Sequence, residues 1–165
     1  MADAFTTFGD DALGDLDTVG LIEALASGGV SPTELRDASL ARANAARVPL
    51  NAVVTMVDDP AIASGPFNGI PTFVKDNEDI AGLPTSHGSR ATSRNPKTVT
   101  SAFAEQYQRL GFTVLGKSTL PEFGLTATTE PLATGPTRNP WNPDHSSGGS
   151  SGGSASLVAA GVVPI

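Results

Sequence analysis

Two short apolar runs, each ending in a lysine, limit most strongly what this chain can fold into. Residues 69–75 read Gly-Ile-Pro-Thr-Phe-Val-Lys, and residues 112–117 read Phe-Thr-Val-Leu-Gly-Lys. Both have the length and composition of buried β-strands, and residues 102–110 between them show a helical apolar pattern. A strand, a helix and a second strand in this order form a crossover connection in a sheet covered by helices. The sequence therefore predicts an α/β fold.

The segments before these runs predict two helices and a further strand. Apolar residues repeat at helical spacing over residues 16–25, before a Ser-Gly-Gly stop. A Ser-Pro-Thr-Glu capping box at residues 31–34 predicts a second helix that ends at Arg47. Residues 50–57 have a β-rich composition and predict a strand. Residues 1–15 are acidic, and we expect them to form a loose leader.

Composition excludes several classes of function. The 165 residues are 39% hydrophobic, enough for one core, and carry a net charge of −7 without a basic cluster, so nucleic acid is not an expected partner. The chain has no cysteine, which excludes disulfides, thiolate metal sites and thiol nucleophiles, so any nucleophile must carry oxygen. No stretch resembles a signal peptide or a membrane span, and we expect a cytoplasmic protein without a membrane partner.

Residues 148–154, Gly-Gly-Ser-Ser-Gly-Gly-Ser, precede a helix-like apolar run and allow three interpretations. A flexible linker should be followed by another domain, and only residues 155–165 follow. A phosphate-binding loop should have a lysine after its glycines and an apolar strand before them, and both are missing. A catalytic serine loop would use the glycines for unusual backbone conformations and the hydroxyls for proton transfer. The third interpretation explains most of the segment.

A serine loop of this kind needs a base. The two histidines of the chain, His87 and His145, lie in surroundings that do not identify either as a catalyst. The residues before Lys75 are more apolar than those before any other lysine in the chain. Burial of Lys75 would lower its pKa and keep the amine neutral. The alternative is an ordinary lysine at a strand edge, paired with Asp76 or Glu78.

Four motifs in their order along the chain resemble the amidase signature family. They occupy residues 69–77, 115–123, 137–143 and 148–154, and the resemblance runs from about Val19 to the last residue. The spacing between Lys75 and Ser150 agrees with the family pattern. Residues 129–131 and 137–142 look closest to the branch that contains cyclic-amide and nylon-oligomer hydrolases.

The resemblance implies a mixed β-sheet with helices on both faces and hydrolysis of amides by a Ser/cis-Ser/Lys triad, with no metal or organic cofactor. Lys75 would be the terminal base, and Ser150, preceded by a cis peptide bond, the bridging serine. The residues implied to support this loop are four glycines that allow its tight backbone and two serines that donate hydrogen bonds: Gly148, Gly149, Gly152, Gly153, Ser151 and Ser154.

The resemblance also implies that one part of the triad lies outside this sequence. The family carries its nucleophilic serine in a second glycine motif, about two dozen residues beyond the bridging serine, with backbone N–H groups for the oxyanion nearby. We therefore expect residues 16–165 to be the N-terminal part of a single amidase domain. We expect this chain alone to be inactive.

Two other functions stay open. The glutaminase subunit of a tRNA-dependent amidotransferase shares the fold and the triad, and the chain could also be a non-catalytic fragment or half of a split protein. The expected partner is a small-molecule amide, and the full-length protein is expected to be a homodimer. Phe123, Leu125 and Trp141 are expected either to line the substrate pocket or to pack in the core or in the loops.

Overall fold

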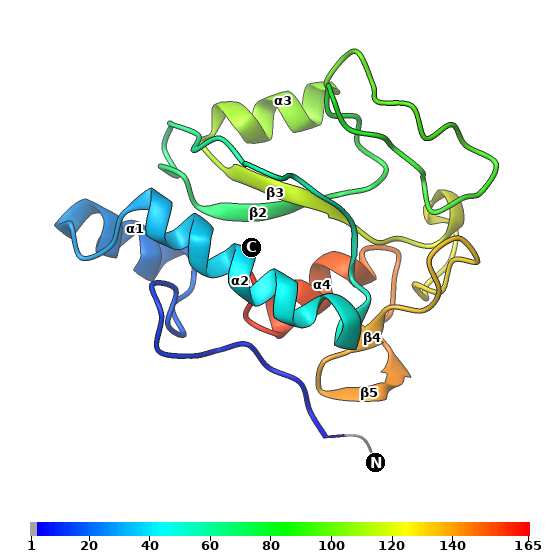
Figure 1. Cartoon of the computed structure of the whole chain (residues 1–165), viewed down its shortest axis with the longest axis horizontal. Coiled ribbons are helices and arrows are strands. Elements are labelled where there is room, and N and C mark those ends of the chain that lie inside the picture. The colour runs from blue at the N-terminus through cyan, green and yellow to red at the C-terminus, as the bar shows by residue number, and fades with distance from the viewer. Residues whose placement is uncertain (1–2) are drawn as a thin grey trace.

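The computed structural model describes residues 3–165, which form a small sheet surrounded by helices and long loops (Figure 1). No helix in this part of the chain combines the length and apolar character needed to cross a membrane. In chain order the elements are α1 (Thr18–Ser27), α2 (Pro32–Leu50), β1 (Val53–Met56), β2 (Pro71–Lys75), α3 (Ala102–Arg109), β3 (Thr113–Ser118), the 3₁₀ turn η1 (Glu122–Gly124), β4 (Arg138–Asn139), β5 (Asn142–Ser146) and α4 (Gly152–Ala159).

The three-stranded sheet has the order β1-β3-β2 and is mixed. Strands β2 and β3 are parallel and are joined through α3, which confirms the predicted crossover. Strand β1 runs antiparallel to β3 and is shorter than the predicted run over residues 50–57. A parallel pair requires a long connection, and α3 with its flanking loops supplies it.

Helices cover both faces of this sheet, as predicted (Figure 1). Phe73 and Leu115 pack against α2 and α4 in the largest buried cluster. Val74, the next residue of β2, packs on the opposite side with Val114 and with Ala104 of α3. Because successive side chains of a strand alternate between faces, β2 can contribute to both cores within five residues.

Helix α2 begins as predicted and ends later. Ser31 Oγ accepts a hydrogen bond from the Glu34 N–H at 3.3 Å, while the Glu34 carboxylate accepts one from the Ser31 N–H at 2.8 Å, which is a complete capping box. The helix continues through Pro49 to Leu50 rather than ending at Arg47. Leu50 is fully buried, so its packing offsets the unfavourable proline in the last turn.

The acidic leader is packed rather than loose over its described residues. Leu13 is 3% exposed, and the Asp11 carboxylate forms an ion pair with the buried Arg42 of α2 at 2.6 Å. The Arg42 guanidinium also donates to the Gly14 and Gly161 carbonyl oxygens. The expectation of a loose segment was wrong because α2 and the chain after α4 supply partners that are distant in sequence. Met1 and Ala2 lie outside the described residues.

The irregular segment over residues 118–147 is ordered but contains more structure than predicted. Strands β4 and β5 form a two-stranded antiparallel sheet near its end. Strand β5 reads Asn-Pro-Asp-His-Ser, a composition with little strand propensity, and its residues are exposed or half-buried. These features explain why the sequence did not predict the hairpin.

Gly116 lies in β3 at a point where the neighbouring strands β1 and β2 come very close to it. A Cβ at this position would collide with the Thr55 backbone oxygen and lie 2.9 Å from the Phe73 ring. The strand pairing is irregular here, since Thr72 faces Val114 and Phe73 faces Gly116. A bulge of this kind changes which side of the sheet the following residues face.

We expect Gly116→Ala to lower the free energy of unfolding by about 1–3 kcal/mol, because the new methyl group meets backbone that cannot move aside. Urea denaturation followed by circular dichroism measures this. Gly9→Ala is the control, since a Cβ there would meet only the Thr7 oxygen at 3.8 Å. Equal unfolding midpoints for the two variants would contradict the prediction.

Candidate active site

Lys75 and Ser150 are in direct contact although 75 positions separate them. The Lys75 Nζ donates to Ser150 Oγ at 2.7 Å and to Ser151 Oγ at 2.9 Å. Lys75 is the last residue of β2, after four buried residues, and both serines precede α4. The contact arises because α4 packs beside β2 and brings its N-terminal end to the end of that strand.

The backbone before Ser150 has the form that the family resemblance implies. The Gly149–Ser150 peptide bond is cis, and Gly148 has a left-handed conformation with φ of 74°. Gly149 lies against the Thr128 backbone, where a Cβ would come within 2.8 Å of the Thr128 oxygen. Thr129 holds the loop from the same side, since its hydroxyl donates to the Gly148 oxygen at 2.7 Å. Sequence reasoning used Thr129 only as part of the stretch at residues 129–131 and did not predict that it contacts the serine loop.

Part of the predicted serine loop belongs to a helix. Gly152, Gly153 and Ser154 form the first turn of α4. Both glycines are buried, and a Cβ on Gly153 would collide with the Thr119 backbone, so close packing explains them rather than loop flexibility. The Ser154 hydroxyl pairs with the Ser118 hydroxyl at 2.8 Å, whereas Ser151 accepts from Lys75.

The Lys75 amine has hydroxyl partners and no carboxylate. Burial lowers its pKa, because the charged amine is less well solvated than in water. Among residues 3–165, the ion pairs do not include Lys75: Asp76 pairs with Lys117, and the Glu78 carboxylate accepts from Ser101. The alternative of an ordinary strand-edge lysine paired with Asp76 or Glu78 is therefore wrong.

The two histidines do not join the site. His87 stacks on Phe123 with ring centroids 6.3 Å apart, and His145 is exposed on β5. Among the described residues, no hydrogen bond connects either imidazole to Lys75 or Ser150. Residues 3–165 also contain no group of three or more His, Asp or Glu side chains that could hold a metal ion.

A cavity of about 300 Å³ opens beside Lys75. Its wall includes Phe73, Phe103, Tyr107 and Ser151. The three predicted pocket or core residues lie elsewhere, since Phe123, Leu125 and Trp141 are 51%, 81% and 75% exposed and none lines this cavity. Packing in the buried core is wrong for all three, because the irregular segment that carries them lies at the surface. Phe123 instead packs against another loop, where it stacks on His87.

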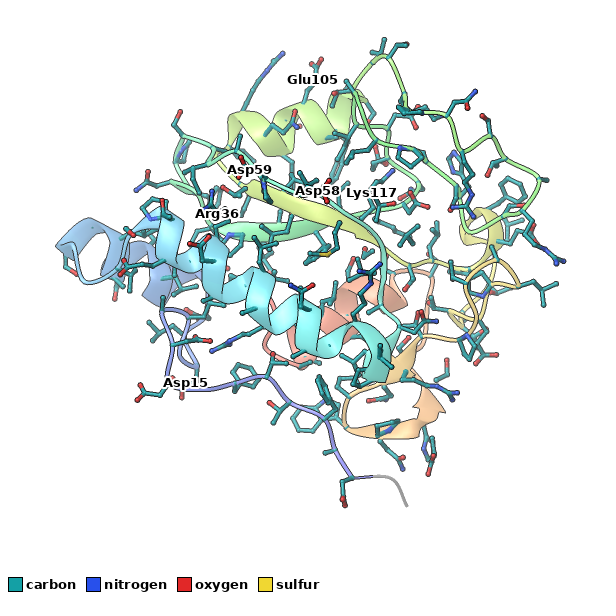
Figure 2. All side chains as sticks on the ribbon, in the orientation of Figure 1. Asp15, Arg36, Asp58, Asp59, Glu105 and Lys117 are labelled. Carbon is teal, nitrogen blue, oxygen red and sulfur yellow. The ribbon has the colours of Figure 1, made fainter. Side chains whose placement is uncertain are left out.

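Lys117 and Asp76 form a fully buried ion pair that sequence reasoning missed. Their side chains are 0% and 1% exposed, and Lys117 Nζ lies 2.9 Å from Asp76 Oδ1. Figure 2 labels Lys117 together with Arg36 and Asp59, whose own ion pair lies at the surface with Asp59 95% exposed. The available signal was a lysine in an otherwise apolar run, because such a charge is buried only when paired.

Known proteins share this architecture and these motifs. The amidase family model matches residues 34–165. The chain belongs to the amidase family. A putative amidase AmiC of Mycobacterium tuberculosis is 45% identical to it, with 96% of this chain and 35% of that protein aligned. A glutamyl-tRNA(Gln) amidotransferase subunit from Deinococcus radiodurans is 38% identical over 88% of this chain and 32% of that protein.

A solved amidase-family structure gives the same result in three dimensions. The structure of 6-aminohexanoate cyclic dimer hydrolase matches with a TM-score of 0.86 and 36% identity, over 94% of this chain and 34% of that one. The expected family is thereby confirmed, and so is the expected fold, a mixed sheet with helices. The chain spans about a third of the length of the curated relatives it matches.

Proposed function

We propose that this chain supplies the base and the bridging serine of an amidase that hydrolyses small-molecule amides through a Ser/cis-Ser/Lys triad. The observation that carries the proposal is the 2.7 Å hydrogen bond from the Lys75 amine to Ser150 in a site without a carboxylate partner for the lysine. Because burial lowers its pKa, such an amine loses its proton at a lower pH than a lysine in water. The proposed enzyme acts in the cytoplasm and needs no cofactor.

In the proposed reaction, neutral Lys75 accepts the proton of Ser150 while Ser150 accepts the proton of a nucleophilic serine outside residues 1–165. That serine attacks the amide carbonyl, and backbone N–H groups stabilise the oxyanion. The protons return through Ser150 to the leaving amine, and water then hydrolyses the acyl-enzyme. Residues 1–165 alone are proposed to lack this activity.

The proposal is tested by comparing this chain with a version extended through the next Gly-Gly-Ser motif. Amide hydrolysis and labelling by a fluorophosphonate probe are measured on both. Only the extended protein should hydrolyse and be labelled. If residues 1–165 alone are folded and active, the roles assigned above are wrong, and the nucleophile is one of the five serines of the loop region: Ser146, Ser147, Ser150, Ser151 and Ser154.

A second candidate is the glutaminase subunit of a tRNA-dependent amidotransferase, favoured by the similarity to the glutamyl-tRNA(Gln) amidotransferase subunit. The extended protein distinguishes the two functions when glutamine and simple linear or cyclic amides are compared as substrates. Glutamine-dependent ammonia release in preference to the other amides would favour the amidotransferase. Hydrolysis of the other amides without preference for glutamine would favour the amidase.

The rate of the extended enzyme should rise with pH through the pKa of Lys75. Protonated Lys75 cannot accept a proton, and burial places its pKa below the ordinary lysine value. The value of kcat/KM should therefore reach its plateau at a lower pH than it would with an exposed lysine as the base. Stopped or continuous assays from about pH 6 to about pH 10 measure the profile. Lys97→Met should leave the profile unchanged, and a flat profile over this range would argue against a lysine base.

A further inference from the structure

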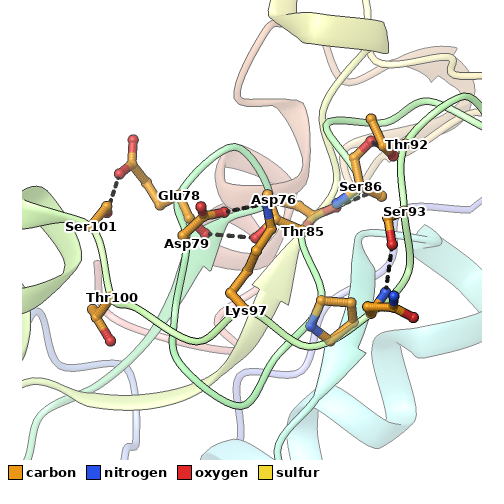
Figure 3. A network of polar contacts seen from close by, with 12 residues as sticks. Asp76, Glu78, Asp79, Thr85, Ser86, Thr92, Ser93, Lys97, Thr100 and Ser101 are labelled. Atoms are coloured by element: carbon orange, nitrogen blue, oxygen red, sulfur yellow. Dashed lines mark hydrogen bonds and ion pairs between the residues drawn. The ribbon is translucent and has the colours of Figure 1, made fainter.

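The buried ion pair lies directly after Lys75 and organises the loop that follows it. Figure 3 shows part of this loop, where Asp76 lies beside Ser86 and Glu78 beside Ser101. Besides Asp76, the Lys117 ammonium donates to the Glu78 backbone oxygen at 2.7 Å and to Thr85 Oγ1 at 2.8 Å. All of these acceptors belong to residues 76–85. The buried Lys117 ammonium therefore binds several groups of the loop that follows β2.

Asp76 is fixed from several directions. Its N–H donates to the Ser118 oxygen at 3.1 Å, which continues the pairing of β2 with β3 by one residue. Its second carboxylate oxygen accepts from the N–H and the hydroxyl of Ser86. The Asp76 side chain is thus turned to Lys117 and Ser86, while the adjacent Lys75 side chain is turned to Ser150.

This arrangement separates two charges that would otherwise attract. A carboxylate close to a lysine favours the protonated amine, and Asp76 is the sequence neighbour of Lys75. Because Lys117 pairs with Asp76, the carboxylate charge is compensated on the side away from Ser150. Among residues 3–165, serine hydroxyls are then the only hydrogen-bond partners of the Lys75 amine.

The remaining titratable groups near Lys75 are few. The cavity wall carries Glu78 and Tyr107. Glu78 is bound by the Ser101 hydroxyl at 2.6 Å, and burial raises the pKa of the Tyr107 phenol, which keeps it neutral. Residues 148–159, which include α4 and the loop before it, contribute hydroxyls and no charged side chain. Asp76 and Lys117 therefore form the buried pair of opposite charges next to Lys75.

We propose that Lys117 is a positioning residue for Lys75: by pairing with Asp76 it anchors the end of β2 and keeps the Asp76 carboxylate from the Lys75 amine. The inference rests on the proposed function only in giving Lys75 the role of base. It adds a residue that touches neither substrate nor the triad serines.

The chain is well suited to a direct test because it has three lysines, Lys75, Lys97 and Lys117. Lysine labelled with ¹³C and ¹⁵N gives one side-chain signal for each, and NMR titration gives the protonation midpoint of Lys75. The variants are Lys117→Gln, Asp76→Asn and the combination of both. Lys97→Met is the matched control, since Lys97 pairs with Asp79 of the same loop at 3.3 Å but is partly exposed.

The two single variants should move the Lys75 midpoint in opposite directions. Lys117→Gln leaves Asp76 uncompensated and should raise the midpoint, so that the neutral fraction of Lys75 at fixed pH falls by about threefold to tenfold, where one pKa unit is tenfold. Asp76→Asn leaves the Lys117 charge uncompensated and should lower the midpoint. The Lys75 midpoint of the double variant should be close to that of the parent protein, and Lys97→Met should leave the Lys75 midpoint unchanged.

A purely structural role for the pair gives a different result. Loss of packing would expose Lys75 in every variant and raise its midpoint in all of them, including Asp76→Asn. That outcome, or an unchanged midpoint in both single variants, overturns the proposal. None of these titrations requires catalysis, so they can succeed even if the proposed amide hydrolysis fails.

The unmutated chain provides a measurement that does not depend on the folding of any variant. Lys75 should lose its proton at a lower pH than a lysine in water, because burial lowers its pKa. A Lys75 midpoint at or above the ordinary lysine value contradicts the proposal.

Discussion

Ser150→Ala is expected to lower kcat of the extended enzyme by about 10²–10⁴-fold, the usual contribution of a group that transfers the reacting proton. Ser151→Ala is the matched control, since the Lys75 amine donates to both hydroxyls at nearly the same distance, 2.7 and 2.9 Å. Only Ser150 has the proposed bridging role, whereas Ser151 occupies the N-cap position of α4 without a capping hydrogen bond from its side chain. Ser151→Ala should therefore lower kcat by about tenfold or less. Steady-state kinetics with an amide substrate measure both effects.

Lys75→Met provides the complementary variant, because it removes the amine from the same proton relay. The double variant Lys75→Met/Ser150→Ala should be about as slow as either single variant, since groups that act as one unit have strongly non-additive effects. Losses that multiply would indicate that Lys75 and Ser150 act separately. An equal loss in Ser151→Ala and Ser150→Ala would contradict the assignment of the bridging serine.

Lys117→Met is expected to lower the free energy of unfolding by about 3–5 kcal/mol, because removing one member of a buried ion pair leaves the other charge without compensation. Asp76 would keep Ser86 as a partner but lose Lys117 from an interior in which both side chains are almost fully enclosed. Denaturation of residues 1–165 by urea, followed by circular dichroism, gives the change in midpoint and free energy.

Lys97→Met is again the control for this effect. The Lys97–Asp79 pair lies in the same loop, but its side chains are 35% and 37% exposed, and pairs of that kind contribute about 0–1 kcal/mol. The double variant Asp76→Asn/Lys117→Met should recover part of the loss, because it removes both buried charges. A loss in Lys117→Met no larger than in Lys97→Met would show that the buried pair does not anchor the loop.

Local patterns in the sequence predicted most of the elements that build the site. The apolar runs that end at Lys75 and Lys117 are β2 and β3, and the helical pattern between them is α3. The capping box at residues 31–34 starts α2 as predicted. These predictions depend on residues that are neighbours in the chain, so a single sequence contains the information they need.

Elements that depend on distant partners were not predicted. Helix α2 extends past Arg47 because Leu50 reaches the core, and the leader is held because Asp11 meets Arg42. Strand β5 has no strand-like composition and pairs with β4 through its backbone. In each case a tertiary contact outweighs the local propensity.

The candidate site shows the same division. The sequence by itself determined the crossover of β2, α3 and β3, the family, and the pair of motifs that contain Lys75 and Ser150. Only the tertiary structure decided which lysine is paired with a carboxylate: Asp76 binds Lys117 rather than its neighbour Lys75. Adjacent side chains on a strand diverge, and the irregular pairing at Gly116 sets where the following residues of β3 lie, so this choice depends on the packing of the sheet rather than on distance along the chain.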